Sequence, residues 1–233
     1  EIMPSLVGSE MCIRDRIEEE LEKVRVCREA VGSDFDFVLE AHRGMNVPEA
    51  ITFGNEVAKY RPMVFEDPIT PDNPDAMAEV AAKVPVPIAT GERFINLKEF
   101  ETVMARHGCQ YIRPDVCAVG GITTSKKICA LAEAHDVLVI PHNPLGPVST
   151  AACLQLCASI PNLGIQELPG FCLNGAEDAM VKEPLHFENG CLMIPDAPGI
   201  GVELSENAEE LYPANERGSN AAKRAFDGSV KDW

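Results

Sequence analysis

The sequence predicts an α/β fold of the parallel (β/α)-barrel type. Helix-like and strand-like segments alternate along the chain, and ionisable side chains recur near the ends of its short apolar runs. The recurring residues, at intervals of 26, 26, 23, 27 and 25 residues, are Glu40, Glu66, Glu92, Asp115, His142 and Glu167. One strand, one crossover helix and two turns need about 25 to 30 residues. The six side chains are therefore expected at the C-terminal ends of successive parallel strands, where barrels of this type carry their active sites.

The composition fits one enzyme-sized domain and excludes some partners. The chain has 233 residues and 45% hydrophobic content, enough for a single barrel domain of roughly 250 residues. A formal net charge of −17 repels phosphate, so neither nucleic acid nor an anionic membrane is expected as a partner. No apolar run approaches the roughly 18 residues of a membrane span. Nine cysteines without a CxxC pair indicate a reducing cytoplasm and no disulfide framework.

Residues 1–16 are expected to stand apart from the fold. The stretch MPSLVGSEMCIRDR, at residues 3–16, resembles a translated sequencing adapter and is left out of fold reasoning. The alternative is an ordinary flexible N-terminal tail. Residues 17–179 are then expected to form a partial barrel, and residues 180–233, rich in Gly and Pro, a C-terminal hairpin and arm.

The elements between residues 17 and 167 follow from hydrophobic periodicity and from helix start and stop signals. Apolar residues at helical spacing predict a first helix at residues 17–31. A strand at residues 35–42 then places Glu40 and His42 on one face, because they are two residues apart. The remaining predicted elements are helices at about 48–60, 96–107, 121–135 and 147–160, a helix that begins at Pro74, and strands at 63–67, 87–92, 111–115, 137–142 and 164–167.

Three of the recurring acids suit a hard divalent cation. Glu40, Glu66 and Glu92 end adjacent predicted strands, so their carboxylates are expected close together. Mg²⁺ prefers oxygen ligands and keeps several waters, so one oxygen from each glutamate leaves positions for a chelating substrate. A single such acid is more often part of a surface ion pair, but three at nearly equal spacing favour a metal site. The lack of clustered Cys and His ligands argues against zinc.

The next strand ends predict acid–base chemistry. Asp115 and His142 end consecutive strands, so the carboxylate can orient the imidazole and stabilise its charged form. His142 is therefore a candidate general base, whereas an isolated histidine would more often simply bond a backbone carbonyl. His42 shares its predicted strand face with the first metal ligand. It is expected to approach a bound substrate from the opposite side, so that the two histidines divide the roles of base and acid.

A set of motifs resembles one known family. EAHRG, FEDP, ATGERF, IRPD, GGIT, PHNPLGPVSTAACLQL and IQE, in this order and spacing, resemble the barrel domain of the enolase superfamily, mandelate racemase subgroup. The similarity is to acid-sugar dehydratases of the D-galactonate dehydratase type, and it extends from Ile17 to about Leu204. It implies an incomplete TIM-like (β/α)7β barrel with six of the eight strands. It also implies that the N-terminal α+β capping domain of the family is absent.

The resemblance also implies an activity and a set of roles. The implied reaction is Mg²⁺-dependent dehydration of a sugar acid such as galactonate to a 2-keto-3-deoxy sugar acid, by a cytoplasmic homo-oligomeric hydro-lyase. The implied metal ligands are Glu40, Glu66 and Glu92, and the implied catalytic residues are His142 with Asp115 as base, His42 as acid and Glu167 as a stabiliser of the enediolate. The first ligand is commonly Asp in this family, so the extra methylene of Glu40 displaces its carboxylate and weakens any substrate assignment by analogy.

Other interpretations stay open. A racemase or epimerase of a 2-hydroxy acid would use the same enediolate but would need a second base, usually a lysine on a strand that this chain lacks. A non-catalytic descendant would have lost a ligand or a histidine, and none is lost. Because six strands cannot close an eight-stranded barrel, this chain by itself is expected to expose unpaired strand edges, to aggregate, and to be inactive and weak in Mg²⁺ binding.

Overall fold

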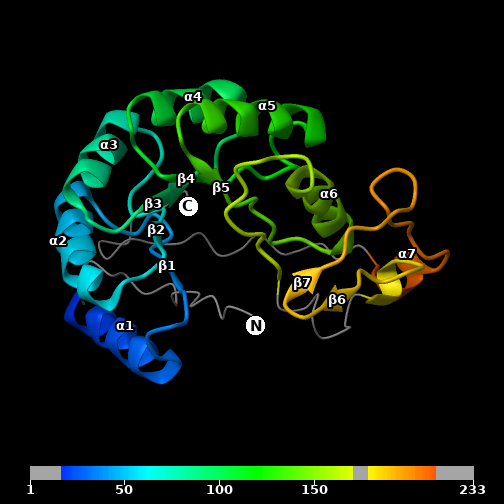
Figure 1. Cartoon of the computed structure of the whole chain (residues 1–233), viewed down its shortest axis with the longest axis horizontal. Helices are drawn as coiled ribbons and strands as arrows, with labels where there is room; N and C mark the ends of the chain where they lie inside the picture. Colours follow the sequence, from blue (N-terminus) through cyan, green and yellow to red (C-terminus); the bar gives the residue numbers. More distant parts are fainter. Residues whose placement is uncertain (1–16, 170–177, 214–233) are drawn as a thin grey trace.

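The computed structural model describes residues 17–169 and 178–213 (Figure 1). The expectations for residues 1–16, and for the arm beyond residue 213, concern residues outside this described part. The domain boundaries proposed from the sequence therefore stay predictions.

Five parallel strands form one sheet in chain order, as the α/β prediction requires. The strands are β1 (Val38–Glu40), β2 (Val64–Glu66), β3 (Ile88–Thr90), β4 (Tyr111–Ile112) and β5 (Leu138–Val139). The helices are α1 (Ile17–Val31), α2 (Val47–Val57) with the short η2 (Ala58–Tyr60), α3 (Pro74–Lys83), α4 (Leu97–Ala105), α5 (Gly121–Ala134) and α6 (Pro147–Cys157). The helices form an arc outside the strands, which is the arrangement of a partial barrel wall (Figure 1).

The sixth predicted strand, at residues 164–167, is wrong for the described residues. The sheet continues past β5 only through one parallel bridge between Val139 and Leu163. The backbone N–H of Gly164 donates to the carbonyl of Val139 at 2.8 Å, and beyond this point side chains replace the ladder. The Asn143 Nδ2 donates to the carbonyl of Glu167 at 3.2 Å. The carbonyl of Glu167 is thus bonded by a side-chain amide, and the described residues 164–167 form no regular strand.

Capping residues set where the helices begin. Asn46 and Glu49 form a capping box at the start of α2, and Asn96 and Glu99 form a second one at α4. Asn73 accepts from two backbone N–H groups at the start of α3. Each cap satisfies N–H groups that have no partner within the helix. Each of the loops before these three helices therefore begins at the sheet and ends at a capped helix N-terminus.

One hydrophobic cluster holds the helices on the sheet. Strand residues and helix residues with 0–4% exposure belong to the same cluster, among them Phe65, Ile88, Ile112 and Val139 from the strands, and Phe53, Met77, Phe100 and Ile128 from the helices. Burial of such side chains stabilises the fold by about 1.5–3 kcal/mol each. None of the helices in the described ranges is long and apolar enough to cross a membrane.

The C-terminal part forms small elements apart from the sheet. After η4 (Asp178–Met180), the antiparallel pair β6 (Phe187–Glu188) and β7 (Cys191–Leu192) makes a hairpin, and α7 (Ala208–Leu211) follows. In Figure 1 these elements lie beyond α6 at one end of the molecule. A hairpin is thus present in the segment where Gly and Pro signals predict one.

Gly91 provides a test of how tightly the turn after β3 is packed. Its φ is +127°, and an added Cβ would lie 2.8 Å from Phe100 Cε1 and 3.1 Å from the backbone nitrogen of Arg113. Gly32 also has a positive φ, +79°, but nothing lies within 4 Å of an added Cβ. We expect Gly32→Ala to cost about 1–2 kcal/mol from backbone strain. Gly91→Ala should cost a further ~1–3 kcal/mol from overpacking. Denaturant unfolding measures both, and equal losses would contradict this account.

Candidate active site and metal centre

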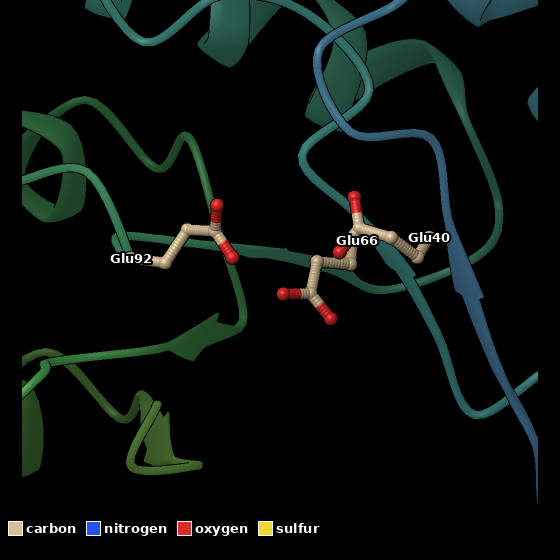
Figure 2. A group of neighbouring side chains, drawn as sticks. All are labelled: Glu40, Glu66 and Glu92. Carbon is tan, nitrogen blue, oxygen red and sulfur yellow. The ribbon is translucent and has the colours of Figure 1, made fainter. Parts of the chain in front are cut away.

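Three glutamates meet at the C-terminal edge of the sheet. Glu40 and Glu66 are the last residues of β1 and β2 and are Cα partners in the parallel register. Glu92 follows β3 after Gly91. One possible ligand atom from each lies within 4.8 Å of the other two. Figure 2 shows the three side chains extending toward one another from separate strand ends.

The electrostatics of this cluster fit a divalent cation. Burial raises the pKa of Glu40 well above its usual range, and the charges of Glu66 and Asp67 raise it further. Burial also raises the pKa of Glu66, to about 7, although the charge of Arg113 opposes the shift. Crowded, buried carboxylates resist ionisation unless positive charge is added. A set of three carboxylates matches the oxygen ligands of a hard cation, so the donor set is consistent with a divalent metal site.

Asp115 and His142 form a dyad beside the cluster. They are bridge partners, and His142 Nδ1 lies 3.0 Å from Asp115 Oδ2. The backbone N–H groups of Cys117 and Ala118 donate to Asp115 Oδ1 at 2.8 and 3.1 Å. Burial works against ionisation of Asp115, but the bonds from His142 and the two N–H groups outweigh it and lower the pKa of Asp115. The carboxylate therefore stays charged and fixes the imidazole.

The other nitrogen of His142 faces the three glutamates. His142 Nε2 lies 3.4 Å from Glu92 Oε2. Burial would lower the pKa of His142, but the hydrogen bond to Asp115 and the charge of Glu92 outweigh burial and raise it. Burial would raise the pKa of Glu92, and the charges of His142 and Arg43 overcome it and lower that pKa. The dyad and the carboxylate cluster therefore form one continuous site.

His42 does not lie on a strand face. The strand β1 ends at Glu40, and His42 sits in a turn with φ +48°, so the reasoning from strand alternation is wrong for this residue. Its backbone N–H donates to Glu40 Oε1, and its Nε2 lies 2.8 Å from Arg43 Nη2. The side chain is exposed next to the first glutamate. His42 therefore lies next to the glutamate cluster because of this turn and not because of strand alternation.

Glu167 joins the site without a regular strand. Its Oε2 accepts hydrogen bonds from Arg113 Nη2 and, at 2.7 Å, from the backbone N–H of Asn143. Arg113 also donates from Nη1 to Glu66 Oε2 at 2.5 Å. The structure thus links the last acid of the series to a glutamate of the cluster through one guanidinium.

Two buried arginines are the functional candidates that sequence reasoning missed. Arg43 donates from Nη1 to Asp67 Oδ2 at 2.8 Å and to Glu92, and Arg113 holds Glu66 and Glu167 as described. Both side chains are at most 7% exposed. A signal was available, because each arginine lies within three residues of a recurring acid: Arg43 in EAHRG and Arg113 in IRPD. A cation so close to a buried acid is needed to offset the cost of its charge.

Comparisons with known proteins agree with this geometry. A family model described as enolase C-terminal domain-like matches residues 7–208. The chain belongs to this family. The resemblance stated from the motifs is thereby confirmed. The match begins at residue 7, inside the adapter-like stretch, so the foreign origin of residues 1–16 stays a prediction.

Several curated proteins that are similar to this chain are named dehydratases. The D-galactonate dehydratase of Xanthomonas oryzae pv. oryzae (strain PXO99A) is 34% identical over 219 residues, 91% of this chain and 57% of that protein. The D-galactonate dehydratase of Cronobacter sakazakii (strain ATCC BAA-894) is 34% identical over 227 residues, 94% of this chain and 59% of that protein. The chain therefore spans a little over half the length of these relatives.

Solved structures of enolase-superfamily proteins superimpose well on this chain. A member of the enolase superfamily from Salmonella Typhimurium has a TM-score of 0.81 and 34% identity, covering 84% of this chain and 50% of that chain. A mandelate racemase/muconate lactonizing enzyme from Sulfitobacter sp. has a TM-score of 0.81 and 34% identity, covering 92% and 53%. The parallel α/β architecture is thereby confirmed.

The raised pKa values of the cluster predict a particular pH dependence of stability. The folded pKa of Glu66, about 7, and that of Glu40 exceed the ordinary glutamate value of 4.5. The folded state therefore binds more protons than the unfolded state above pH 4.5, and stability falls as pH rises through the folded values. His142 acts in the same direction. We expect the metal-free protein to melt lower at about pH 8 than at about pH 5.5, and Glu66→Gln to reduce that difference.

The control for this measurement is Glu101→Gln, which removes one negative charge from an exposed position on α4. Calorimetry in a chelating buffer, followed by addition of Mn²⁺, gives the comparison. Mn²⁺ should stabilise the wild type most at the higher pH, where fewer protons compete with the ion for the carboxylates. An identical pH dependence in the wild type and in Glu66→Gln would contradict the account of the cluster.

Proposed function

We propose that this chain carries the active-site residues of a protein that dehydrates a sugar acid in a Mg²⁺-dependent reaction and releases a 2-keto-3-deoxy sugar acid. The observation that carries the proposal is the contact between two chemical units: His142 Nε2 of the dyad lies 3.4 Å from Glu92 Oε2 of the carboxylate cluster. This contact supports a proposed base next to a proposed cation site, an arrangement that suits abstraction of a proton next to a carboxylate. The names of the curated relatives support galactonate or a similar aldonate as the substrate.

Glu40, Glu66 and Glu92 are the proposed metal ligands. Bound there, Mg²⁺ supplies positive charge that makes the proton beside the substrate carboxylate more acidic. Two neighbouring arginines offset part of the negative charge of these glutamates. Arg43 engages Glu92, and Arg113 engages Glu66.

His142 is the proposed general base. Asp115 occupies Nδ1 at 3.0 Å, so Nε2 is the nitrogen that accepts the proton from C2 of the substrate. The carboxylate of Asp115 then stabilises the imidazolium that forms. Removal of the proton leaves an enediolate on the substrate.

His42 is the proposed general acid for the departing 3-hydroxyl. A guanidinium only donates hydrogen bonds, so His42 Nε2 accepts from Arg43 Nη2, 2.8 Å away. To act as an acid the imidazole must carry a proton on both nitrogens, because a neutral ring that lost its Nδ1 proton would become an imidazolate. Protonation at Nε2 releases the bond from Arg43, and the imidazolium then gives one proton to the leaving hydroxyl and returns to the neutral ring. Loss of water and ketonisation of the resulting enol complete the reaction.

Glu167 is the proposed stabiliser of the enediolate. Its Oε2 already accepts from Arg113 and from the N–H of Asn143. The proposed hydrogen bond to the substrate oxyanion therefore requires a proton on Oε1, the oxygen that these two contacts leave. Carboxylic acids act in this way when their site keeps them neutral.

A racemase or epimerase of 2-hydroxy acids is the second candidate, because it shares the enediolate. It needs a second base on the opposite side of C2, usually a lysine on a strand outside this chain, whereas His42 beside Glu40 favours dehydration. The product separates the two reactions. Dehydration yields a 2-keto acid detectable by semicarbazide absorbance, whereas racemisation yields none.

Replacement of His142 tests the assignment of the base. Because this chain by itself is expected to be inactive and spans only 57% of a curated relative, the test uses a protein completed to the length of the relatives. We expect that protein to exchange the C2 proton of its substrate in deuterated water and to form the 2-keto product. His142→Asn should lower the rate of exchange by roughly 10²–10⁴-fold, because the proton acceptor is lost. His107→Asn is the matched control: His107 is exposed at the end of α4, with φ +57°, a conformation that asparagine tolerates. Exchange at the wild-type rate in His142→Asn, followed by NMR, would show that another group is the base.

A further inference from the structure

Arg113 connects two acids that belong to different parts of the chain. It directly follows β4, and its two terminal nitrogens donate to Glu66 Oε2 and to Glu167 Oε2 across 47 and 54 residues of sequence. Its side chain is 7% exposed. A guanidinium fork that spans two carboxylates orients both, because its donors lie in one rigid plane.

The guanidinium of Arg113 is oriented toward the two acids although one of its own nitrogens, Nε, is left without a hydrogen-bond partner in the described part of the chain. Its Nε is buried and has no hydrogen-bond partner among the described residues. A buried N–H without a partner destabilises a fold, so a purely structural arginine would be expected to use it. Both terminal nitrogens point instead to acids of the proposed site.

The backbone of Arg113 is fixed as firmly as its side chain. Its N–H donates to the carbonyl of Thr90 at 2.9 Å. The absence of a side chain at Gly91 permits this approach, since a Cβ there would lie 3.1 Å from the Arg113 nitrogen. The guanidinium therefore starts from a fixed point between β3 and β5.

We propose that Arg113 is a positioning residue that decides which oxygens Glu66 and Glu167 present to the site. It occupies Oε2 of each, so Oε1 of Glu66 is the oxygen left for a cation and Oε1 of Glu167 is the one left for substrate. This inference rests on the proposed function for its account of Glu167. Its consequence for cation binding depends only on Glu66.

Positioning and simple electrostatics predict opposite effects when Arg113 is removed. A fixed positive charge next to a cation site repels the cation, so loss of the charge alone would strengthen binding. Loss of positioning frees the Glu66 carboxylate to rotate or to pair with a neighbour, which weakens binding. Lysine retains the charge but is a point donor that cannot hold two carboxylates as a planar fork.

The experiment is a Mn²⁺ titration, followed by electron paramagnetic resonance, of the wild type, Arg113→Met and Arg113→Lys. We expect Arg113→Met to raise the Kd for Mn²⁺ by about 10–100-fold, the usual effect of losing a partner that orients a metal ligand. Arg113→Lys should also bind more weakly than the wild type. Substrate is not needed for this measurement.

The matched control is Arg28→Met. Arg28 is a structural arginine that donates to the carbonyls of Tyr60 and Phe35 at 2.8 and 2.7 Å and lies 4.4 Å from the centroid of the Phe37 ring. Its loss should lower the melting temperature and leave the Kd for Mn²⁺ unchanged. A thermal melt of each variant shows whether it is folded.

Folded Arg113→Met that binds Mn²⁺ as tightly as the wild type, or more tightly, would overturn the proposal. A wild-type protein that binds no Mn²⁺ would overturn it as well, together with the metal site. Weakened binding in both Arg113 variants supports it, even if no sugar acid is dehydrated. In that case only the proposed substrate and reaction fail.

Discussion

The register of the parallel strands is the constraint on which the site depends. Pairing of β1 with β2 makes Glu40 and Glu66 Cα partners, and the turn after β3 adds Glu92, so ligand atoms of three acids lie within 4.8 Å. Such a concentration of carboxylates in a half-buried place is unfavourable unless positive charge balances it. Burial, and after it the charges of neighbouring carboxylates, raise the pKa values of Glu40 and Glu66, and two arginines packed against the cluster supply positive charge.

Strained turns after the first two strands bring the balancing groups into place. Arg43 and Asp67 both have positive φ, at +63° and +39°, which side-chain-bearing residues rarely adopt. The backbone N–H of Arg43 donates to the carbonyl of Asp67 at 2.7 Å, and Thr90 Oγ1 donates to Asp67 Oδ1 at 2.6 Å. These bonds join three consecutive strand ends. They offset the cost of the left-handed turns and aim Arg43 at Glu92.

The periodicity of the sequence determined the main features of the fold and part of the site. Helices, five parallel strands and the grouping of Glu40, Glu66 and Glu92 follow from local patterns, since strand and helix periods are properties of short segments. The adjacency of Asp115 and His142 follows from the same spacing. Each of these features needs only the order of the elements and the rule that parallel strands end at one edge.

Only the tertiary structure decided where the first strand ends, whether the last predicted strand forms, and which arginine side chains contact the acids. His42 lies in a turn because the strand ends at Glu40, and residues near Glu167 bond to a side-chain amide in place of a sheet ladder. The contacts of Arg43 and Arg113 join residues up to 54 positions apart. A one-dimensional pattern carries no record of such contacts, because they depend on how separate elements pack and on which buried charges then need partners.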